Sequence, residues 1–168
     1  MGLITKPQKV KLILGMIAAK PKLFAEAADL MSKKFGKIDY ESPVLKFDYT
    51  DYYNKEMGSG LKRKFIGFKK LINQDDLAAI KIYTNKLEKR FAAKGKRRIN
   101  LDPGFISKAK LILATTKDRA HRIYLKDGIY AEVTLQYRGG SFKPGCWAYP
   151  DYRTKRYMRI FNEIRTKL

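Results

Sequence analysis

The sequence predicts an α+β fold, a ferredoxin-like sandwich in the order β-α-β-β-α-β that is extended by a C-terminal β-hairpin and a terminal helix. Three observations support this prediction. Short β-branched and aliphatic runs are typical of strands, two longer segments repeat apolar residues at helical spacing, and the two kinds of segment follow one another in this order. No linker rich in Pro, Gly or Ser divides the 168 residues, so we expect one domain over residues 1–168.

The first strand and the first helix are marked by proline and glycine. Residues 10–17 form an apolar run between Pro7 and Pro21, and this close bracketing favours a buried strand over a helix. Residues 23–35 then repeat apolar residues at helical spacing, and Gly36 supplies a C-terminal stop.

Two more strands and a second helix are predicted next. The extended segment at residues 44–49 and the alternating run at residues 61–71 predict the second and third strands. Asn73 is a suitable cap for a helix whose apolar stripe covers residues 77–91, and Gly95 ends it.

The remaining elements are shorter. Residues 99–101 predict a strand that ends in a turn at residues 102–104, which read Asp-Pro-Gly. A further segment covers residues 111–116, and two strands join at residues 127–128, an Asp-Gly hairpin turn. The chain closes with a helix over residues 157–164.

The net charge is the most unusual property of the chain. Its 37 Lys and Arg residues face 16 Asp and Glu residues, which gives a formal charge of +21. Such an excess repels itself, and a polyanionic partner such as a phosphorylated ligand or RNA would relieve the repulsion. A Lys-rich surface also improves solubility, which is the alternative interpretation.

Several classes of protein are excluded by composition. The longest apolar run, residues 12–19, is too short to span a bilayer, so we expect no membrane partner. No signal-peptide cleavage site follows it, which favours a cytoplasmic location. One His and one Cys cannot form a zinc site of the usual ligands, and the Walker loop and the G-x-S-x-G motif are missing. A magnesium ion held by oxygen ligands remains a candidate cofactor.

The segment from residue 114 to residue 122 is the strongest candidate for ligand binding. Hydroxyls and cations are concentrated between two predicted strands, and we assign phosphate or nucleotide binding to Thr115, Thr116, Lys117 and Arg122. The only histidine, His121, lies in the same segment and is a candidate for proton transfer.

Glu132 is the candidate partner of this histidine. A two-residue turn at residues 127–128 places Glu132 diagonal to His121, whereas a three-residue loop places it opposite Arg122. Because Glu132 lies among apolar neighbours on a strand, we expect it to be paired or metal-bound in either register. We therefore propose His121 and Glu132 as catalytic candidates.

Two aspartates are the candidate metal ligands. Asp51 follows a turn-forming Thr50, and Asp102 ends a predicted strand on the face that also presents Arg98 and Asn100. Arg98 is assigned to phosphate binding on this basis. The alternative is structural, because turn residues explain Asp-Pro-Gly without any function.

The segment before the last helix mixes aromatic residues with an acid. Trp147 is either a core residue or a platform on which a base stacks, and we include it among the nucleotide-binding candidates. Asp151 is either part of a helix cap or a site residue.

Six motifs along the chain together resemble those of domain-of-unknown-function family 4416 of prokaryotes. They are Thr50–Tyr53, Asn100–Gly104, Ala114–Lys117, His121–Leu125, Tyr130–Leu135 and Tyr149–Tyr152. Members of that family are mostly called hypothetical, and some are labelled GTP-binding proteins. The resemblance implies that the motif positions are site candidates: Asp51, Asp102, Lys117, His121, Arg122, Glu132 and Asp151.

The leading hypothesis is a mixed acidic and basic pocket that binds a phosphorylated ligand, most simply a nucleotide. If magnesium binds there, the pocket could support phosphoryl chemistry. The alternative is an RNA-binding module that uses a basic face and aromatic residues of the sheet, for which Lys64–Phe68 is a loose match to the known strand pattern.

Overall fold

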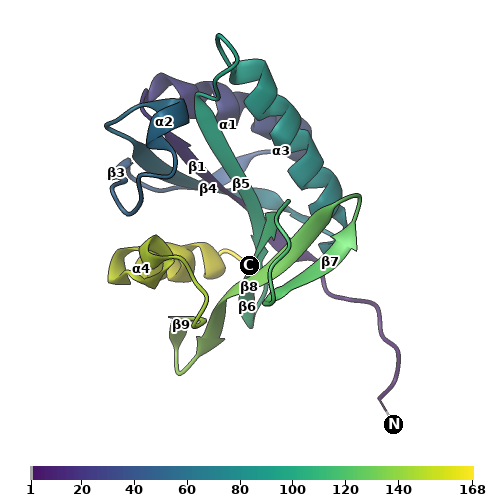
Figure 1. Cartoon of the computed structure of the whole chain (residues 1–168). Coiled ribbons are helices and arrows are strands. Elements are labelled where there is room, and N and C mark those ends of the chain that lie inside the picture. The colour runs from purple at the N-terminus through teal and green to yellow at the C-terminus, as the bar shows by residue number, and fades with distance from the viewer. Residues whose placement is uncertain (1) are drawn as a thin grey trace.

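In the computed structural model, which describes residues 2–168, nine strands join in one sheet (Figure 1). The strand order is β2-β4-β1-β5-β6-β8-β7, while β3 pairs with β4 and β9 pairs with β8. The strands are β1 (Val10–Ala18), β2 (Ile38–Glu41), β3 (Leu45–Lys46), β4 (Lys62–Ile72), β5 (Ile99–Ile106), β6 (Lys110–Thr115), β7 (Arg122–Lys126), β8 (Ile129–Arg138) and β9 (Ser141–Pro144). The helices are α1 (Lys22–Phe35), α2 (Asn54–Met57), α3 (Leu77–Phe91) and α4 (Lys155–Arg165), with 3-10 turns η1 (Gln74–Asp76) and η2 (Pro150–Arg153).

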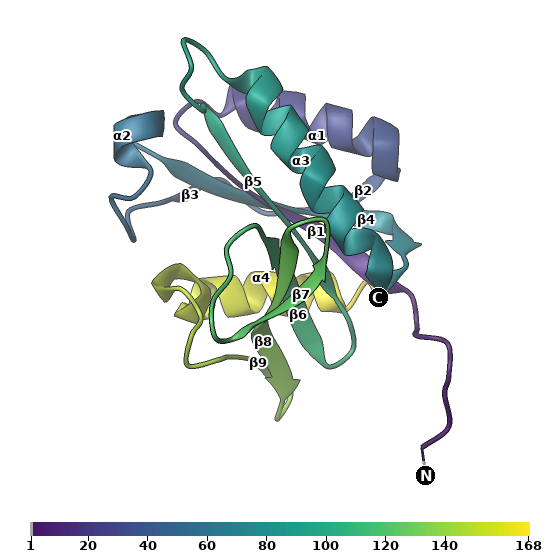
Figure 2. The ribbon, with the colours of Figure 1, turned by 45° about the vertical axis from the view of Figure 1, so that its right-hand side comes forward.

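The ferredoxin-like core predicted from the sequence is confirmed. Strands β2, β4, β1 and β5 are neighbours in that order, and each adjacent pair is antiparallel. Helices α1 and α3 lie side by side on one face of these strands (Figure 2), and their apolar residues enter one core with those of β1 and β4. The α+β class therefore follows from the two amphipathic stripes that the sequence displays.

Helix α4 covers the opposite face of the sheet. Its buried residues Tyr157, Ile160, Phe161 and Ile164 follow helical spacing and pack in a second core with Phe65 of β4. The centroids of the Phe65 and Phe161 rings are 5.0 Å apart.

The covering helices bear on the RNA hypothesis. Phe65 is buried on the α4 side of the sheet, and Phe68 is buried in the core that contains α1 and α3. Neither ring is accessible to a base. An RNA partner would therefore have to use a basic surface rather than these aromatic residues of the sheet.

The second strand lies earlier than predicted. Residues 38–41 pair with β4, whereas of the predicted segment 44–49 only Leu45 and Lys46 do. Pro43 lies between the two paired stretches, and because proline has no N–H to donate, it interrupts the ladder there.

The predicted turn at Asp102-Pro103-Gly104 is wrong. These residues lie inside β5, which pairs with β1 from Ile99 to Ile106. The pairing of β5 with β6 is much shorter and begins only at Gly104. Pro103, which has no N–H to donate, immediately precedes this pairing, so β6 leaves β5 at this point and the sheet forks.

Gly104 is required where the strands part. A Cβ built there would lie 2.3 Å from the carbonyl oxygen of Ile112 and 2.7 Å from Leu113 Cδ2. The first of these neighbours is backbone, so it cannot move without disturbing the ladder. The glycine therefore permits β6 to approach β5 closely just before the two strands separate.

We expect Gly104→Ala to lower the free energy of unfolding by about 3 kcal/mol, because the added methyl group overpacks the strand pair. Urea denaturation followed by circular dichroism measures this loss. Gly67→Ala in β4 is the matched control, since its Cβ would meet only ordinary contacts at 3.4 Å or more. An equal stability for the two variants would contradict the close approach.

Candidate ligand-binding cavity at the sheet fork

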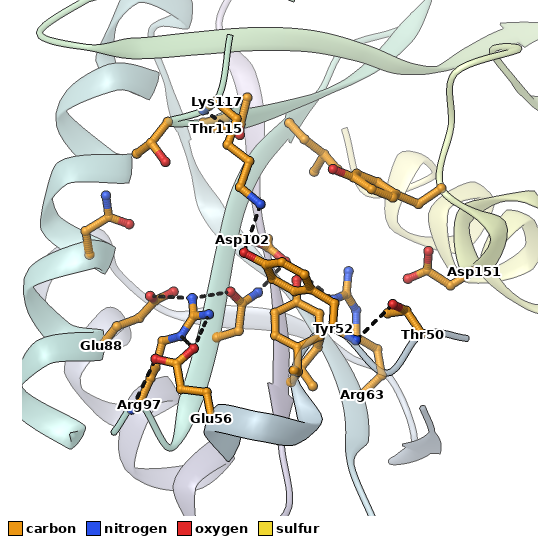
Figure 3. A pocket seen from close by; sticks show the side chains of 18 of the residues that line it. Thr50, Tyr52, Glu56, Arg63, Glu88, Arg97, Asp102, Thr115, Lys117 and Asp151 are labelled. Atoms are coloured by element: carbon orange, nitrogen blue, oxygen red, sulfur yellow. Dashed lines mark hydrogen bonds and ion pairs between the residues drawn. The ribbon is translucent and has the colours of Figure 1, made fainter. Parts of the chain in front are cut away.

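A cavity of about 800 Å³ opens where β6 diverges from β5 (Figure 3). One wall contains Asn100 and Asp102 of β5, and another contains Thr115 at the end of β6. Helix α3 contributes Lys81 and Glu88. We call this space the fork cavity, because it exists only where the ladder between the two strands has ended.

Aromatic rings surround the fork cavity. They belong to Phe47, Tyr49, Tyr52, Tyr53, Tyr149 and Tyr152. Tyr52 and Tyr149 are more than half exposed, at 61% and 51%, so parts of both side chains are open to a ligand. The rings of Tyr53 and Tyr152 are closer to the core and shape the cavity.

Arg63 of β4 is the buried cation of the cavity. Its side chain is 2% exposed, and its guanidinium lies 4.7 Å from the Phe65 ring centroid and 5.3 Å from that of Tyr152. Its Nη2 donates to the Tyr152 hydroxyl at 2.5 Å, and its Nη1 lies 3.4 Å from Asp102 Oδ2. The buried carboxyl of Asp151 also lines the cavity. Burial raises the pKa of Asp151, although the charge of Arg63 acts in the opposite direction.

A chain of hydrogen bonds connects α3 to β5. Arg97 Nη1 donates to Glu88 Oε2 at 3.2 Å and to Asn100 Oδ1 at 2.9 Å. Asn100 Nδ2 in turn donates to Asp102 Oδ2 at 2.7 Å. Burial raises the pKa of Glu88. The charge of Lys81 and the hydrogen bond that the Leu101 N–H donates to Glu88 act in the opposite direction. The chain holds the polar groups of this wall in fixed orientations.

The opposite wall presents a cation. Lys117 Nζ lies 3.0 Å from the Tyr52 hydroxyl and 4.4 Å from the centroid of that ring, and Figure 3 shows the two side chains reaching toward each other. Within residues 2–168 Lys117 forms no ion pair with a carboxylate. Its backbone N–H donates to Thr115 Oγ1 at 3.2 Å, and Thr115 and Thr116 both line the cavity.

Glu132 of β8 is paired, as the sequence predicts. Its Oε2 accepts from Arg122 Nε at 3.0 Å and lies 3.0 Å from His121 Nε2, while Oε1 accepts from the Thr134 hydroxyl at 3.2 Å. Arg122 also donates to the Lys117 carbonyl and to the Tyr149 hydroxyl. All three nitrogens of the Arg122 guanidinium therefore donate hydrogen bonds to other groups of the protein.

The hairpin between β7 and β8 explains this double pairing. Asp127 and Gly128 form the predicted two-residue turn, with φ of 53° and 73°, and Lys126 pairs with Ile129. The register then shifts between Tyr124 and Lys126, so Arg122 faces Glu132. The predicted turn is confirmed, but the shift gives the pairing that was expected from a longer loop.

His121 and Trp147 lie beside the fork cavity rather than in its lining. Their rings stack at 5.7 Å and 15°, and the Trp147 indole N–H donates to the Val133 carbonyl at 2.8 Å. The indole therefore has one ring face against the imidazole.

The structure brings six of the predicted site residues to the cavity wall. They are Asp102, Thr115, Thr116, Lys117, Arg122 and Glu132. Asp151, which the family resemblance implied, also lines the cavity. Arg98 does not, because β5 begins only at Ile99, and the alternation that placed Arg98 beside Asn100 does not extend into the preceding loop. Its neighbour Arg97 takes that position.

Asp51 and Asp102 do not meet. Asp51 is exposed ahead of α2 and accepts from Asn54 Nδ2 at 2.7 Å, so it acts as a local turn residue. Asp102 is held by Asn100 and Arg63. Among the residues from 2 to 168, no group of three or more His, Cys, Asp or Glu side chains is arranged to hold a metal ion.

Sequence reasoning missed six charged residues of the cavity lining, of which three are buried: Arg63, Lys81 and Glu88. Arg63 shares a strand face with Phe65 and Gly67, and a charge on an apolar face is the signal that could have revealed it. Lys81 and Glu88 are seven residues apart on α3 and are both buried, which places them along the apolar stripe.

Comparison with known proteins gives one match. The family model described as a domain of unknown function (DUF4416) matches residues 8–168. No curated protein and no solved structure matches the chain. Within residues 2–168, no helix has the length and apolar character needed to cross a membrane.

Proposed function

The chain belongs to the DUF4416 family, whose description assigns no activity, and we propose from the geometry of the fork cavity that it binds a phosphorylated small ligand, most simply a nucleotide. One observation supports this proposal above the others: Lys117, which has no carboxylate partner among residues 2–168, borders the same cavity as two exposed tyrosine side chains. A nucleotide presents the matching pair of groups, an anionic phosphate and a flat ring.

The phosphate would lie at the end of β6. Lys117 supplies a charge there, and Thr115 and Thr116 add hydroxyls, which together form a usual phosphate-binding set. Arg122 is fully engaged with Glu132, Tyr149 and the Lys117 carbonyl, so its role is to hold the lysine segment in place.

The base and sugar would occupy the wider part of the cavity. Tyr149 offers an exposed ring for stacking, and Tyr52 would offer a second when Lys117 Nζ moves from that ring to the phosphate. Asp102 on the β5 wall, whose side chain is 26% exposed, can accept a hydrogen bond from a sugar hydroxyl. A volume of about 800 Å³ lies within the usual range of small-molecule sites.

A phosphoryl-transfer step is the chemistry that these groups would support. A hydroxyl of the acceptor molecule would attack the terminal phosphorus of the nucleotide, and the P–O bond to the bridging oxygen would break, so that the shortened nucleotide is the leaving group. Glu132 lines the cavity and would take the proton of the attacking hydroxyl, with His121 in hydrogen-bond contact behind it. Lys117 would neutralise charge that develops on the phosphate. We assign no magnesium ligands in this step, because Asp51, one of the two predicted ligands, does not line the cavity.

Lys117→Ala is expected to weaken nucleotide binding at least tenfold, because a hydrogen bond between charged groups contributes about 1.5–3 kcal/mol. Isothermal titration calorimetry against nucleoside mono-, di- and triphosphates, with and without magnesium, measures this. Lys143→Ala on β9 is the control, since Lys143 is exposed and outside the cavity lining. Absence of heat with every nucleotide would refute the proposal, and equal losses in the two variants would refute the assigned position.

A further inference from the structure

A cluster of exposed cations adjoins the fork cavity. Residues 86–98 contain seven Lys and Arg residues and a single acid, Glu88. We call the six exposed cations of this segment the basic rim: Lys86, Lys89, Arg90, Lys94, Lys96 and Arg98. The seventh, Arg97, is turned inward to Glu88 and Glu56.

The charge of the basic rim is not neutralised by the protein. In the described residues 2–168, the ion pairs of this segment all involve Arg97. Helix α1 is different, because its Lys22 and Lys33 pair with Glu26 and Asp29 one turn away. Exposed cations without an ion pair in the described residues also occur on α4, so the basic rim is distinguished by its six cations between residues 86 and 98 and by its place beside the cavity, where an anionic partner would neutralise them.

The basic rim is continuous with the mouth of the cavity. Lys89, Ala92, Gly95 and Arg97 all belong to the cavity lining. Lys94 and Gly95 form a tight turn with φ of 52° and 72°, closed by mutual hydrogen bonds between Ala93 and Lys96. This turn projects beyond the first residue of β5, as the loop between α3 and β5 at the top of Figures 1 and 2 shows. Its cations are therefore presented outside the cavity and not within it.

We propose that the nucleotide held in the fork cavity is the end of a single-stranded nucleic acid, whose next phosphates lie along the basic rim. This inference rests on the proposed function. The phosphate of a free mononucleotide would bind Lys117, and the cations of the basic rim would then have no anion to bind. A strand supplies one phosphate per nucleotide outside the cavity, and such contacts give strong, salt-dependent affinity.

The shape of the site favours a strand end over a duplex. Strands β5 and β6 and helix α3 enclose the fork cavity. A base can therefore enter it only after it has left the stack of neighbouring bases. Single strands present unstacked bases to aromatic side chains, here Tyr52 and Tyr149.

The test compares two triple variants by fluorescence anisotropy with an RNA octanucleotide. The rim variant is Lys94→Asn, Lys96→Ser and Arg98→Ser, none of which lines the cavity. The control is Lys155→Ser, Arg156→Ser and Arg159→Ser, three exposed cations of α4. We expect the rim variant to bind the octanucleotide at least tenfold more weakly, with the slope of log K against log salt reduced by about 2. The control should change affinity less than threefold.

Calorimetry with a mononucleotide separates this inference from the proposed function. We expect the rim variant to bind the mononucleotide as tightly as the wild type does, and the mononucleotide to displace the octanucleotide. A fluorophore should weaken binding when it is attached to the end that enters the cavity, and not when it is attached to the other end.

Three outcomes would overturn the inference. Equal losses in the rim and control variants would mean that the octanucleotide responds only to total charge. Mononucleotide binding that depends on Lys117, together with an unaffected rim variant, would leave the proposed function intact and remove the strand. Octanucleotide binding that depends on the rim but is not displaced by mononucleotide would show that the two sites are separate.

Discussion

Arg63→Met is expected to lower the free energy of unfolding by about 3–5 kcal/mol, because it removes one partner from a buried charged network. Arg63 is 2% exposed, and its guanidinium contacts the Tyr152 hydroxyl and the Asp102 carboxylate. Methionine fills a similar volume but cannot donate to either group. The buried Asp151 also loses the cation that favours its charged form.

The loss should depend on pH with a definite sign. Burial already raises the pKa of Asp151 above the unfolded value of 3.8, and removal of Arg63 raises the folded-state pKa further. A carboxyl group whose pKa is higher in the folded state destabilises the protein progressively as pH rises from the unfolded to the folded pKa. The deficit of the variant is therefore expected to be smaller near pH 4 than near pH 7.

Urea denaturation at several pH values measures both expectations. Lys64→Met is the control on the same strand. Lys64 is half-buried and, within residues 2–168, its one ion pair is with the exposed Glu41, so the substitution should cost about 1 kcal/mol or less. A deficit for Arg63→Met that equals the control, or one that shrinks as pH rises, would contradict the role given to Arg63.

Periodicity alone was sufficient for the elements with one buried face. Helix α4 is an example, because Tyr157, Ile160, Phe161 and Ile164 repeat at the helical period and all four are buried. Strand β1 was equally clear, since two prolines leave too little room for a helix and all of its residues are buried. In these elements local propensity and tertiary packing favour the same structure.

Asp102-Pro103-Gly104 shows where local rules failed. The tripeptide favours a turn in isolation, but the pairing of β5 with β1 continues through it. The sequence contains no local signal for that pairing, because the partner residues lie near position 14, far away along the chain. Pro103 instead lies where the pairing with β6 stops, and Gly104 permits the close approach of the two strands just before it. The fork cavity opens where the pairing has stopped.

The candidate site was predictable where its residues are contiguous. Thr115, Thr116 and Lys117 follow one another at the end of β6, so they line the cavity together. Arg63 and Glu88 reach it from β4 and α3, and only the tertiary fold shows that they face the same space. His121 contacts Glu132 as expected but lies outside the cavity lining, where its ring stacks on Trp147, a contact between segments that no local pattern reveals.

Glu132→Ala is expected to destabilise the protein by about 3–5 kcal/mol, since it leaves Arg122 without its carboxylate partner in a buried position. The side chains of Glu132 and Arg122 are 3% and 4% exposed. Glu132→Gln retains an acceptor of the same shape but loses the charge, so we expect a loss of about 1–3 kcal/mol. Glu163→Ala is the control, because that exposed carboxylate accepts only from Tyr40 in the described structure.

A double-mutant cycle with Arg122→Met identifies the origin of this effect. If the two charges stabilise each other, the cycle should give a coupling free energy of about 1–3 kcal/mol, and the double variant should be more stable than the sum of single losses implies. Removal of both partners leaves no buried charge, whereas either single variant leaves one. Strictly additive losses would mean that Glu132 stabilises the fold through Thr134 and His121 instead, and Arg122 would then hold the Lys117 segment independently of the carboxylate.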